Sequence, residues 1–169
     1  MVFWADRMHR LHGKGHYHDV VERVVYNNVL GALELSGESF FYQNPLTAAN
    51  ARYPWHVCPC CVGNIPRTLL MLKDVMYATD AGRETLYVNH FVDSAAEVEG
   101  LAGTDVRVAQ ETEYPWRGAV RLTLEPRERA EFAVMVRIPD RTESELYTAA
   151  PEARGFELKV NGERQRARV

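Results

Sequence analysis

The chain has 169 residues, a formal net charge of −3 and 46% hydrophobic residues, which suits one sizeable core or two small ones. Charges of both signs are mixed along the chain, and no basic run would bind a phosphate backbone, so we expect no nucleic-acid partner. No apolar run approaches the roughly 20 residues that a membrane span needs, so we expect no membrane partner either.

The first part of the chain is predicted to be helical. Apolar residues lie at helical spacing in residues 2–12, and a Gly-Lys-Gly stretch then interrupts the pattern. A second helix is predicted over 16–33, where valines repeat every three or four residues around Glu22. Because β-branched valines are weak helix formers, packing would have to stabilise this helix, and Gly37 is expected to form a turn beyond it.

An aromatic run and a loop separate these helices from a third. Residues 38–43 are expected to be extended and residues 46–57 to form a loop. The third helix is predicted over 65–78, with Pro66 in its first turn.

From residue 85 onward the pattern changes to short strands. Alternating or apolar segments predict strands over 86–92, 106–113, 119–124, 132–138 and 156–160. The polar residues 140–155 are expected to form a long loop, and Asn161-Gly162 is a strong hairpin signal. We therefore predict an α+β fold, with helices in residues 1–82 and an antiparallel, sandwich-like sheet in residues 83–169.

All three cysteines lie within four residues, at Cys58, Cys60 and Cys61. Adjacent cysteines rarely reach disulfide geometry with each other, so the pattern argues against a disulfide framework. A thiolate is both a strong nucleophile and a soft metal ligand, so the cluster indicates a metal site, a nucleophile or both. The alternative is a pair of buried small hydrophobic residues. Three thiols do not complete a tetrahedral zinc shell, and no second CxxC or His-x3-His pair accompanies them.

Glu22 is the most unusual carboxylate of the chain, because it lies among valines on a predicted helix. A carboxylate in an apolar setting has either a raised pKa or a firm hydrogen-bond partner, and both are typical of active sites. The alternative is a glutamate on the helix surface, or one paired with Arg23 or Arg67.

Aromatic and histidine side chains give weaker signals. Tyr42 is a candidate hydroxyl donor into a pocket, although an aromatic strand is more often plain core. Trp55 is a candidate for stacking on a sugar ring, against the alternative of a tryptophan buried at a turn. His56 is the one histidine expected near the cysteines. The four histidines of the first helical region are expected on the solvated surface: His9, His12, His16 and His18.

Five segments resemble the β-L-arabinofuranosidases of glycoside hydrolase family 127, in the same order along the chain. The clearest is Trp55 through Arg67, where the family has a Cys-x-Cys-Cys motif followed by an Asn and a helix. The others are residues 15–28, 40–46, 86–89 and 114–139. The resemblance covers nearly the whole chain, which makes it more specific than any single motif.

The resemblance implies an (α/α)6-barrel catalytic domain, of which residues 1–82 would be the end, followed by β-sandwich domains. It implies hydrolysis of terminal β-L-arabinofuranosides or related sugars with retention, through a zinc-bound cysteine in place of the usual carboxylate. Cys60 matches the nucleophile and a Zn²⁺ ligand, and Cys61 matches a second Zn²⁺ ligand. Glu22 and Tyr42 match positions that contact the sugar. Cys58 matches a motif cysteine not assigned to zinc.

Two features depart from the family pattern. The family's Glu-x-Cys zinc ligands and its acid/base glutamate precede the matched region, so the zinc site is expected to be incomplete here and the fragment inactive alone. Val62-Gly63 replaces the family's usual Pro-Pro or Pro-Ser, which indicates a subgroup. Uncovered helix faces would favour self-association. No signal peptide is recognised at the start, and a bacterial cytoplasmic or periplasmic location is the expectation.

Two other interpretations remain open at this point. The strand-rich half would serve as a carbohydrate-binding or structural module that needs no metal. Alternatively, the chain would be a small zinc-binding interaction domain, with ligands such as Cys58, Cys60, Cys61 and His56.

Overall fold

The computed structural model describes residues 1–43, 47, 51–58, 60–140 and 155–167. The chain divides into two compact units, Met1–Arg137 and Ile138–Val169, and each is described by itself. In the described part of the chain, no helix combines the length and apolar character needed to cross a membrane.

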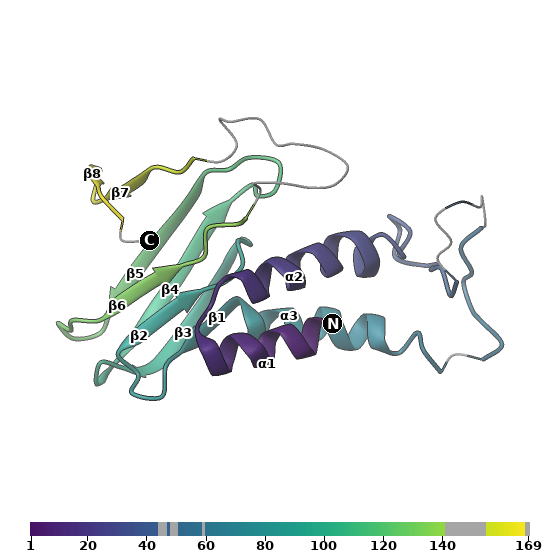
Figure 1. The fold of residues 1–169 in the computed structure, drawn as a ribbon, viewed down its shortest axis with the longest axis horizontal. Coiled ribbons are helices and arrows are strands. Elements are labelled where there is room, and N and C mark those ends of the chain that lie inside the picture. Colours follow the sequence, from purple (N-terminus) through teal and green to yellow (C-terminus); the bar gives the residue numbers. More distant parts are fainter. Residues whose placement is uncertain (44–46, 48–50, 59, 141–154, 168–169) are drawn as a thin grey trace. The chain divides into compact units, whose positions relative to one another are not determined.

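The first unit begins with helices that share a small apolar core. Helix α1 spans Val2–His12 and ends at Gly13, whose left-handed backbone (φ 65°) suits a glycine. Helix α2 spans His16–Val24 and runs beside α1 (Figure 1). Helix α3 spans Asn64–Met76. The buried side chains of this core come from all three helices and from Val25, the first residue after α2: Val2, Ala5, Val21, Val25 and Val75.

The second helical prediction is right in place but not in extent. After Val24 the backbone continues as the π-helix η1, Val25–Leu30, and stops three residues before the predicted end. A Cβ atom on Gly31 would lie 2.7 Å from the carbonyl oxygen of Asn27, so only glycine fits this close approach. The third helix is also shorter than predicted, because Tyr77 is already extended and begins a strand.

A three-stranded sheet follows in the order β1-β2-β6. Its strands are β1 Tyr77–Thr79, β2 Thr85–Val88 and β6 Ala133–Val136. Strands β1 and β2 pair antiparallel, whereas β2 and β6 pair parallel with Leu86 opposite Val134. Side chains alternate between the two faces of a strand, so Leu86 and Val88 enter a core on one face while Tyr87 lies on the other. On that second face Tyr87 contacts the ring of His9 in α1.

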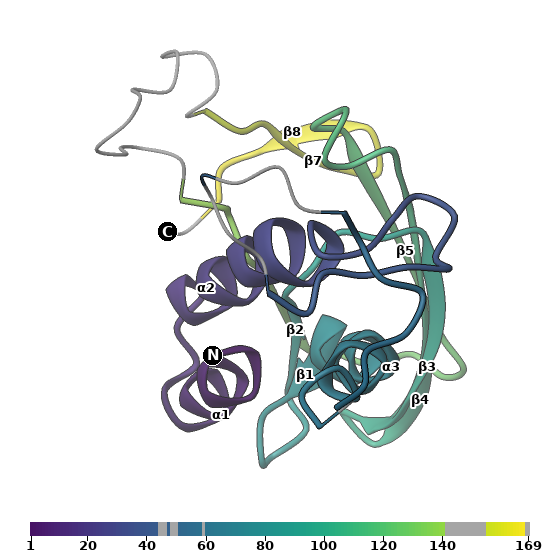
Figure 2. The same ribbon diagram turned by 90° about the vertical axis from the view of Figure 1, so that its right-hand side faces the viewer.

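A second three-stranded sheet has the order β3-β4-β5 and is antiparallel throughout (Figure 2). Its strands are β3 Ser94–Leu101, β4 Thr104–Thr112 and β5 Val120–Pro126. Buried residues of both sheets form one apolar cluster with Phe91, which lies between β2 and β3: Leu86, Val88, Phe91, Leu101, Val106 and Val108. The two sheets therefore pack face to face, as in a sandwich.

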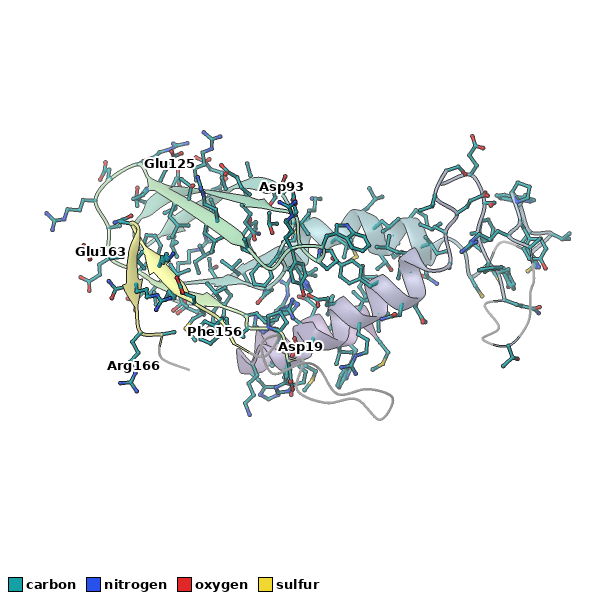
Figure 3. All side chains as sticks on the ribbon, turned by 90° about the horizontal axis from the view of Figure 1, so that it is seen from above. Asp19, Asp93, Glu125, Phe156, Glu163 and Arg166 are labelled. Carbon is teal, nitrogen blue, oxygen red and sulfur yellow. The ribbon has the colours of Figure 1, made fainter. Side chains whose placement is uncertain are left out.

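The second unit contains a hairpin of β7 Leu158–Val160 and β8 Glu163–Gln165. Figure 3 labels Phe156 and Glu163 along it. Asn161 (φ 51°) and Gly162 (φ 87°) both take left-handed backbone angles at the turn. This is the geometry that an Asn-Gly hairpin requires, so the predicted turn is confirmed.

The predicted α+β class is confirmed, with two corrections of detail. The β2–β6 pair is parallel where antiparallel pairing was expected. Strand β3 was missed, and the predicted loop at 140–155 falls almost wholly outside the described residues. The (α/α)6 barrel and the boundary between residues 82 and 83 stay predictions. Strand β1 lies before that boundary and pairs with β2 beyond it.

Candidate active site

The cysteines form a compact cluster at the turn before α3. The Sγ atom of Cys60 lies 3.6 Å from that of Cys58 and 3.5 Å from that of Cys61. All three cysteines are free and exposed in the structure, which does not fit the alternative of buried hydrophobic cysteines. The local fold explains the closeness, since the turn at Cys61–Asn64 winds directly into the first turn of α3.

Tyr42 is brought to this cluster from the preceding extended segment. Its Oη lies 3.2 Å from the Sγ of Cys60 and donates to the Sγ of Cys61 at 3.5 Å. The hydrogen bond from Tyr42, helped by Cys61 and Cys58, lowers the pKa of the Cys60 thiol. The same contact raises the pKa of Tyr42. The hydroxyl therefore stabilises a thiolate at Cys60, which is the reactive form of a cysteine.

His56 supports the cluster from the side. Its ring stacks on Tyr42, with ring centroids 3.8 Å apart and planes 4° from parallel. Its Nδ1 accepts from the backbone N–H of Cys58 at 3.1 Å. The prediction that His56 lies near the cysteines is confirmed. Trp55, next to it, is exposed rather than buried at the turn.

The two adjacent cysteines fit part of a zinc site. Two thiolates on one tetrahedral zinc ion lie about 3.8 Å apart, close to the 3.5 Å between Cys60 and Cys61. Among the described residues, no group of three or more His, Cys, Asp or Glu side chains is arranged to hold a metal ion. The donor set present is thus suited to two of the four positions.

Glu22 lies in a second polar cluster, between α2 and the sheets. Its Oε2 accepts from Arg137 Nη2, and its Oε1 accepts from the Tyr114 hydroxyl at 2.8 Å. Arg137 also pairs with Asp19, at 2.5 Å, and Figure 3 labels Asp19 on α2. Glu22 is therefore paired as the alternative interpretation expected, but with Arg137 instead of Arg23 or Arg67.

Buried histidines lie beside this carboxylate cluster. His18 is fully buried, and its Nδ1 lies 2.8 Å from Nε2 of His90. The ring of His9 packs against that of His18, with centroids 4.3 Å apart. Burial lowers the pKa of His18 to about 2 and that of His90 to about 3. Placing these histidines on the surface was wrong for His9 and His18, because α1 and α2 turn these faces toward each other and toward Tyr87.

The structure thus brings together three of the four residues singled out for chemistry: Tyr42, Cys60 and Cys61. Glu22 is paired instead with Arg137 and Tyr114, two residues that the sequence did not single out. One signal for Arg137 was available. It follows directly on an alternating apolar strand, where a charged side chain needs a partner if it is buried.

Comparisons with known proteins identify the family of the chain. Residues 1–74 match the model of the β-L-arabinofuranosidase GH127 catalytic domain, and residues 85–169 match the model of the GH127 middle domain. A curated non-reducing end β-L-arabinofuranosidase of Bifidobacterium longum subsp. longum is 27% identical over 137 residues. The match covers 73% of this chain and 20% of that protein.

Solved structures are similar over nearly the whole chain. A GH127 β-L-arabinofuranosidase from Geobacillus stearothermophilus T6 superposes with a TM-score of 0.82 at 33% identity, covering 98% of this chain and 26% of that one. A second GH127 β-arabinofuranosidase gives a TM-score of 0.87 at 33% identity, covering 99% and 27%. The chain spans about a fifth of the curated relative and about a quarter of these structures. With both family models matched in order, the chain belongs to glycoside hydrolase family 127, with a catalytic-domain region ahead of a middle-domain region.

Proposed function

We propose that this chain is part of a zinc-dependent retaining glycoside hydrolase that acts on terminal β-L-arabinofuranosides or related sugars, with Cys60 as the nucleophile. The observation that carries the proposal is the contact of Tyr42 with two neighbouring thiols, in a chain of this family. It supports a reactive sulfur in place of the second carboxylate that most retaining glycosidases use.

The thiol chemistry follows from the contacts of Cys60. In the first step its thiolate Sγ attacks the anomeric carbon, the bond to the leaving oxygen breaks, and a carboxylic acid gives that oxygen a proton. In the second step the carboxylate left by that acid takes a proton from a water molecule as its oxygen attacks the same carbon, the carbon–sulfur bond breaks and the thiolate returns. Two inversions give net retention. Glu22 is not assigned the acid role, because both of its oxygens already accept hydrogen bonds from Arg137 and Tyr114.

Cys60 and Cys61 would hold the zinc ion, whose positive charge favours the deprotonated thiolate. The other ligands would be the Glu-x-Cys pair of the family, which the matched region does not include. Tyr42 orients the sulfurs through its hydroxyl and, with Glu22, would bind sugar hydroxyls. Because only two ligands lie in this chain, we expect the 169-residue chain alone to hold zinc weakly and to be inactive.

The test compares the 169-residue chain with the longest natural polypeptide that contains it. Zinc content is measured by metal analysis, and hydrolysis is measured with an aryl β-L-arabinofuranoside. We expect turnover and about one zinc per chain in the longer protein only.

In the longer protein, Cys60→Ser is expected to lower kcat by at least about 10⁴-fold, whereas Cys58→Ser keeps most of the activity. A Cys60→Ser protein with near wild-type turnover would overturn the nucleophile assignment. Turnover by the 169-residue chain alone would overturn the proposal that the site needs residues outside this chain.

A further inference from the structure

Both oxygens of the Glu22 carboxylate are held by residues from the sheet part of the first unit. Arg137 lies directly after β6, and Tyr114 lies just beyond the end of β4. These two donors are 115 and 92 residues from Glu22 in sequence, and each takes a different oxygen. A carboxylate held at one oxygen can still rotate about its last bond, whereas one held at both oxygens has a fixed plane.

The two donors are themselves fixed. Arg137 donates from Nε to the carbonyl oxygen of Asn89 at 2.6 Å and from its backbone N–H to that of Val88 at 3.0 Å. Its guanidinium also pairs with Asp19, one turn before Glu22 on α2. The Tyr114 ring packs edge-on against Phe91, with centroids 5.4 Å apart, within the apolar cluster of the sheets. The orientation of the Glu22 carboxylate therefore depends on the packing of the two sheets, which fixes Arg137 and Tyr114.

The Glu22 carboxylate is more exposed than the Arg137 guanidinium with which it pairs. The side chain of Arg137 is 2% exposed, whereas that of Glu22 is 13% exposed. A ligand that reaches this cluster would therefore contact Glu22 and not Arg137.

We propose that Arg137 and Tyr114 are positioning residues for Glu22. They fix its carboxylate in the direction from which it accepts a hydroxyl of the furanoside, so the middle-domain region sets the geometry of a sugar contact in the catalytic-domain region. The inference rests on the proposed function, because the hydroxyl belongs to the proposed substrate. The inference adds which residues hold the Glu22 carboxylate in place. Their role matters because a small displacement of a group that contacts the substrate lowers the reaction rate by a large factor.

The competing explanation is that the cluster only joins the helices to the sheets. Under that explanation each lost bond lowers stability, and activity falls only as far as folded protein is lost. Under the positioning proposal, activity falls while the protein stays folded. Tyr114→Phe separates the two, because it keeps the ring on Phe91 and removes only the hydroxyl that donates to Glu22.

Tyr77→Phe is the matched control. Tyr77 also has a half-buried hydroxyl with two partners, Ser94 at 2.9 Å and Gln110 at 2.7 Å, and it packs on the same apolar cluster. In the longest natural polypeptide that contains this chain, both variants are expected to lose similar stability. Tyr114→Phe should lower kcat/KM by about tenfold on an aryl β-L-arabinofuranoside, and Tyr77→Phe should leave it within about twofold.

A Glu22→Gln background completes the test. If Tyr114 acts by positioning the Glu22 carboxylate, Tyr114→Phe should cost little further activity once that carboxylate is gone. Equal activity of the Tyr114→Phe and Tyr77→Phe proteins, or fully additive losses with Glu22→Gln, would overturn the positioning role while the proposed function stands. If the wild-type protein neither binds nor hydrolyses the furanoside, the proposed function fails and this inference falls with it.

Discussion

The thiol cluster consists of Cys58, Cys60 and Cys61 with Tyr42, and the Arg137 cluster consists of Arg137, Asp19, Glu22 and Tyr114. The two clusters differ in exposure and in the sequence distance between their members. The thiol cluster is exposed, and its sulfurs come from residues one or two positions apart, with Tyr42 added from 18 residues away. The Arg137 cluster is buried, and its bonds join residues 92 to 118 positions apart. One cluster thus depends on a local turn, and the other depends on the docking of α2 against the sheets.

This difference indicates how each cluster should respond to change. A buried guanidinium between two carboxylates has little solvent to replace a lost partner, so its removal should act on folding. Exposed thiols can exchange partners with water, so changes there should act on reactivity and leave folding nearly intact. Three experiments test this contrast, and they follow in order of expected effect.

Arg137→Met should have the largest effect. It removes the buried cation that pairs with Asp19 and Glu22, each 13% exposed, so we expect a loss of about 3–5 kcal/mol in the free energy of unfolding. Urea unfolding followed by circular dichroism measures this loss.

The matched control for Arg137→Met is Arg127→Met. Arg127 also pairs with two carboxylates, Glu97 and Asp105, but its side chain is 66% exposed, and its loss should cost about 0–1 kcal/mol. Equal losses in the two variants would show that the Arg137 cluster is not a buried one in solution.

Mild acid should have the next effect, through the histidines beside that cluster. The folded-state pKa values of His18 and His90 lie below the ordinary 6.5, chiefly because of burial, so unfolding takes up protons. Their contribution to stability is therefore complete above pH 6.5 and is lost as the pH falls from there toward the folded values near 3 and 2. Protonation would also turn both nitrogens of the 2.8 Å His18–His90 contact into donors.

Arg137, Arg10 and His9 face the same pair and oppose a further positive charge, whereas Asp6 favours one at His9. We expect a loss of about 3 kcal/mol in the free energy of unfolding between pH 6.5 and about pH 5. Urea unfolding at several pH values measures the slope. His18→Gln should flatten it, and His16→Gln, which changes an exposed histidine of the same helix, should not. A wild-type stability that is constant over this range would contradict the buried, neutral pair.

The contrast between the clusters also explains what the sequence could predict. The thiol cluster was predictable because its members are close in the chain and rare in composition, and Tyr42 was found through the family resemblance. The partner of Glu22 was not, since no local pattern links it to a residue 115 positions away. The same reason hides His18, whose contact with His90 spans 72 residues.

Secondary structure follows a similar rule. Helix α1 and the β7–β8 turn were found from local signals, namely helical spacing and an Asn-Gly pair. Strand β3 was missed because its half-buried face is built largely from small residues, and its other face carries glutamates. Its pairing with β4 decides its structure, and that pairing is a tertiary contact.

Tyr42→Phe should have the smallest effect, and it acts on reactivity alone. The Tyr42 hydroxyl is the main cause of the lowered pKa of the Cys60 thiol, so its removal raises that pKa and reduces the thiolate fraction at neutral pH. In metal-free protein near pH 7, we expect Cys60 of the Tyr42→Phe variant to react with iodoacetamide about two- to tenfold more slowly than in the wild type. Mass spectrometry of the peptide that contains Cys60 measures the rate.

Tyr53→Phe is the control for that measurement. Tyr53 pairs with Phe40, and its ring contacts His56 at 5.9 Å between centroids, as the ring of Tyr42 does at 3.8 Å. The control should leave the alkylation rate unchanged, and both variants should unfold at the same urea concentration as the wild type. An unchanged rate in Tyr42→Phe would show that the neighbouring thiols alone set the reactivity of Cys60. A large loss of stability would show that the thiol cluster is tied to folding as firmly as the Arg137 cluster.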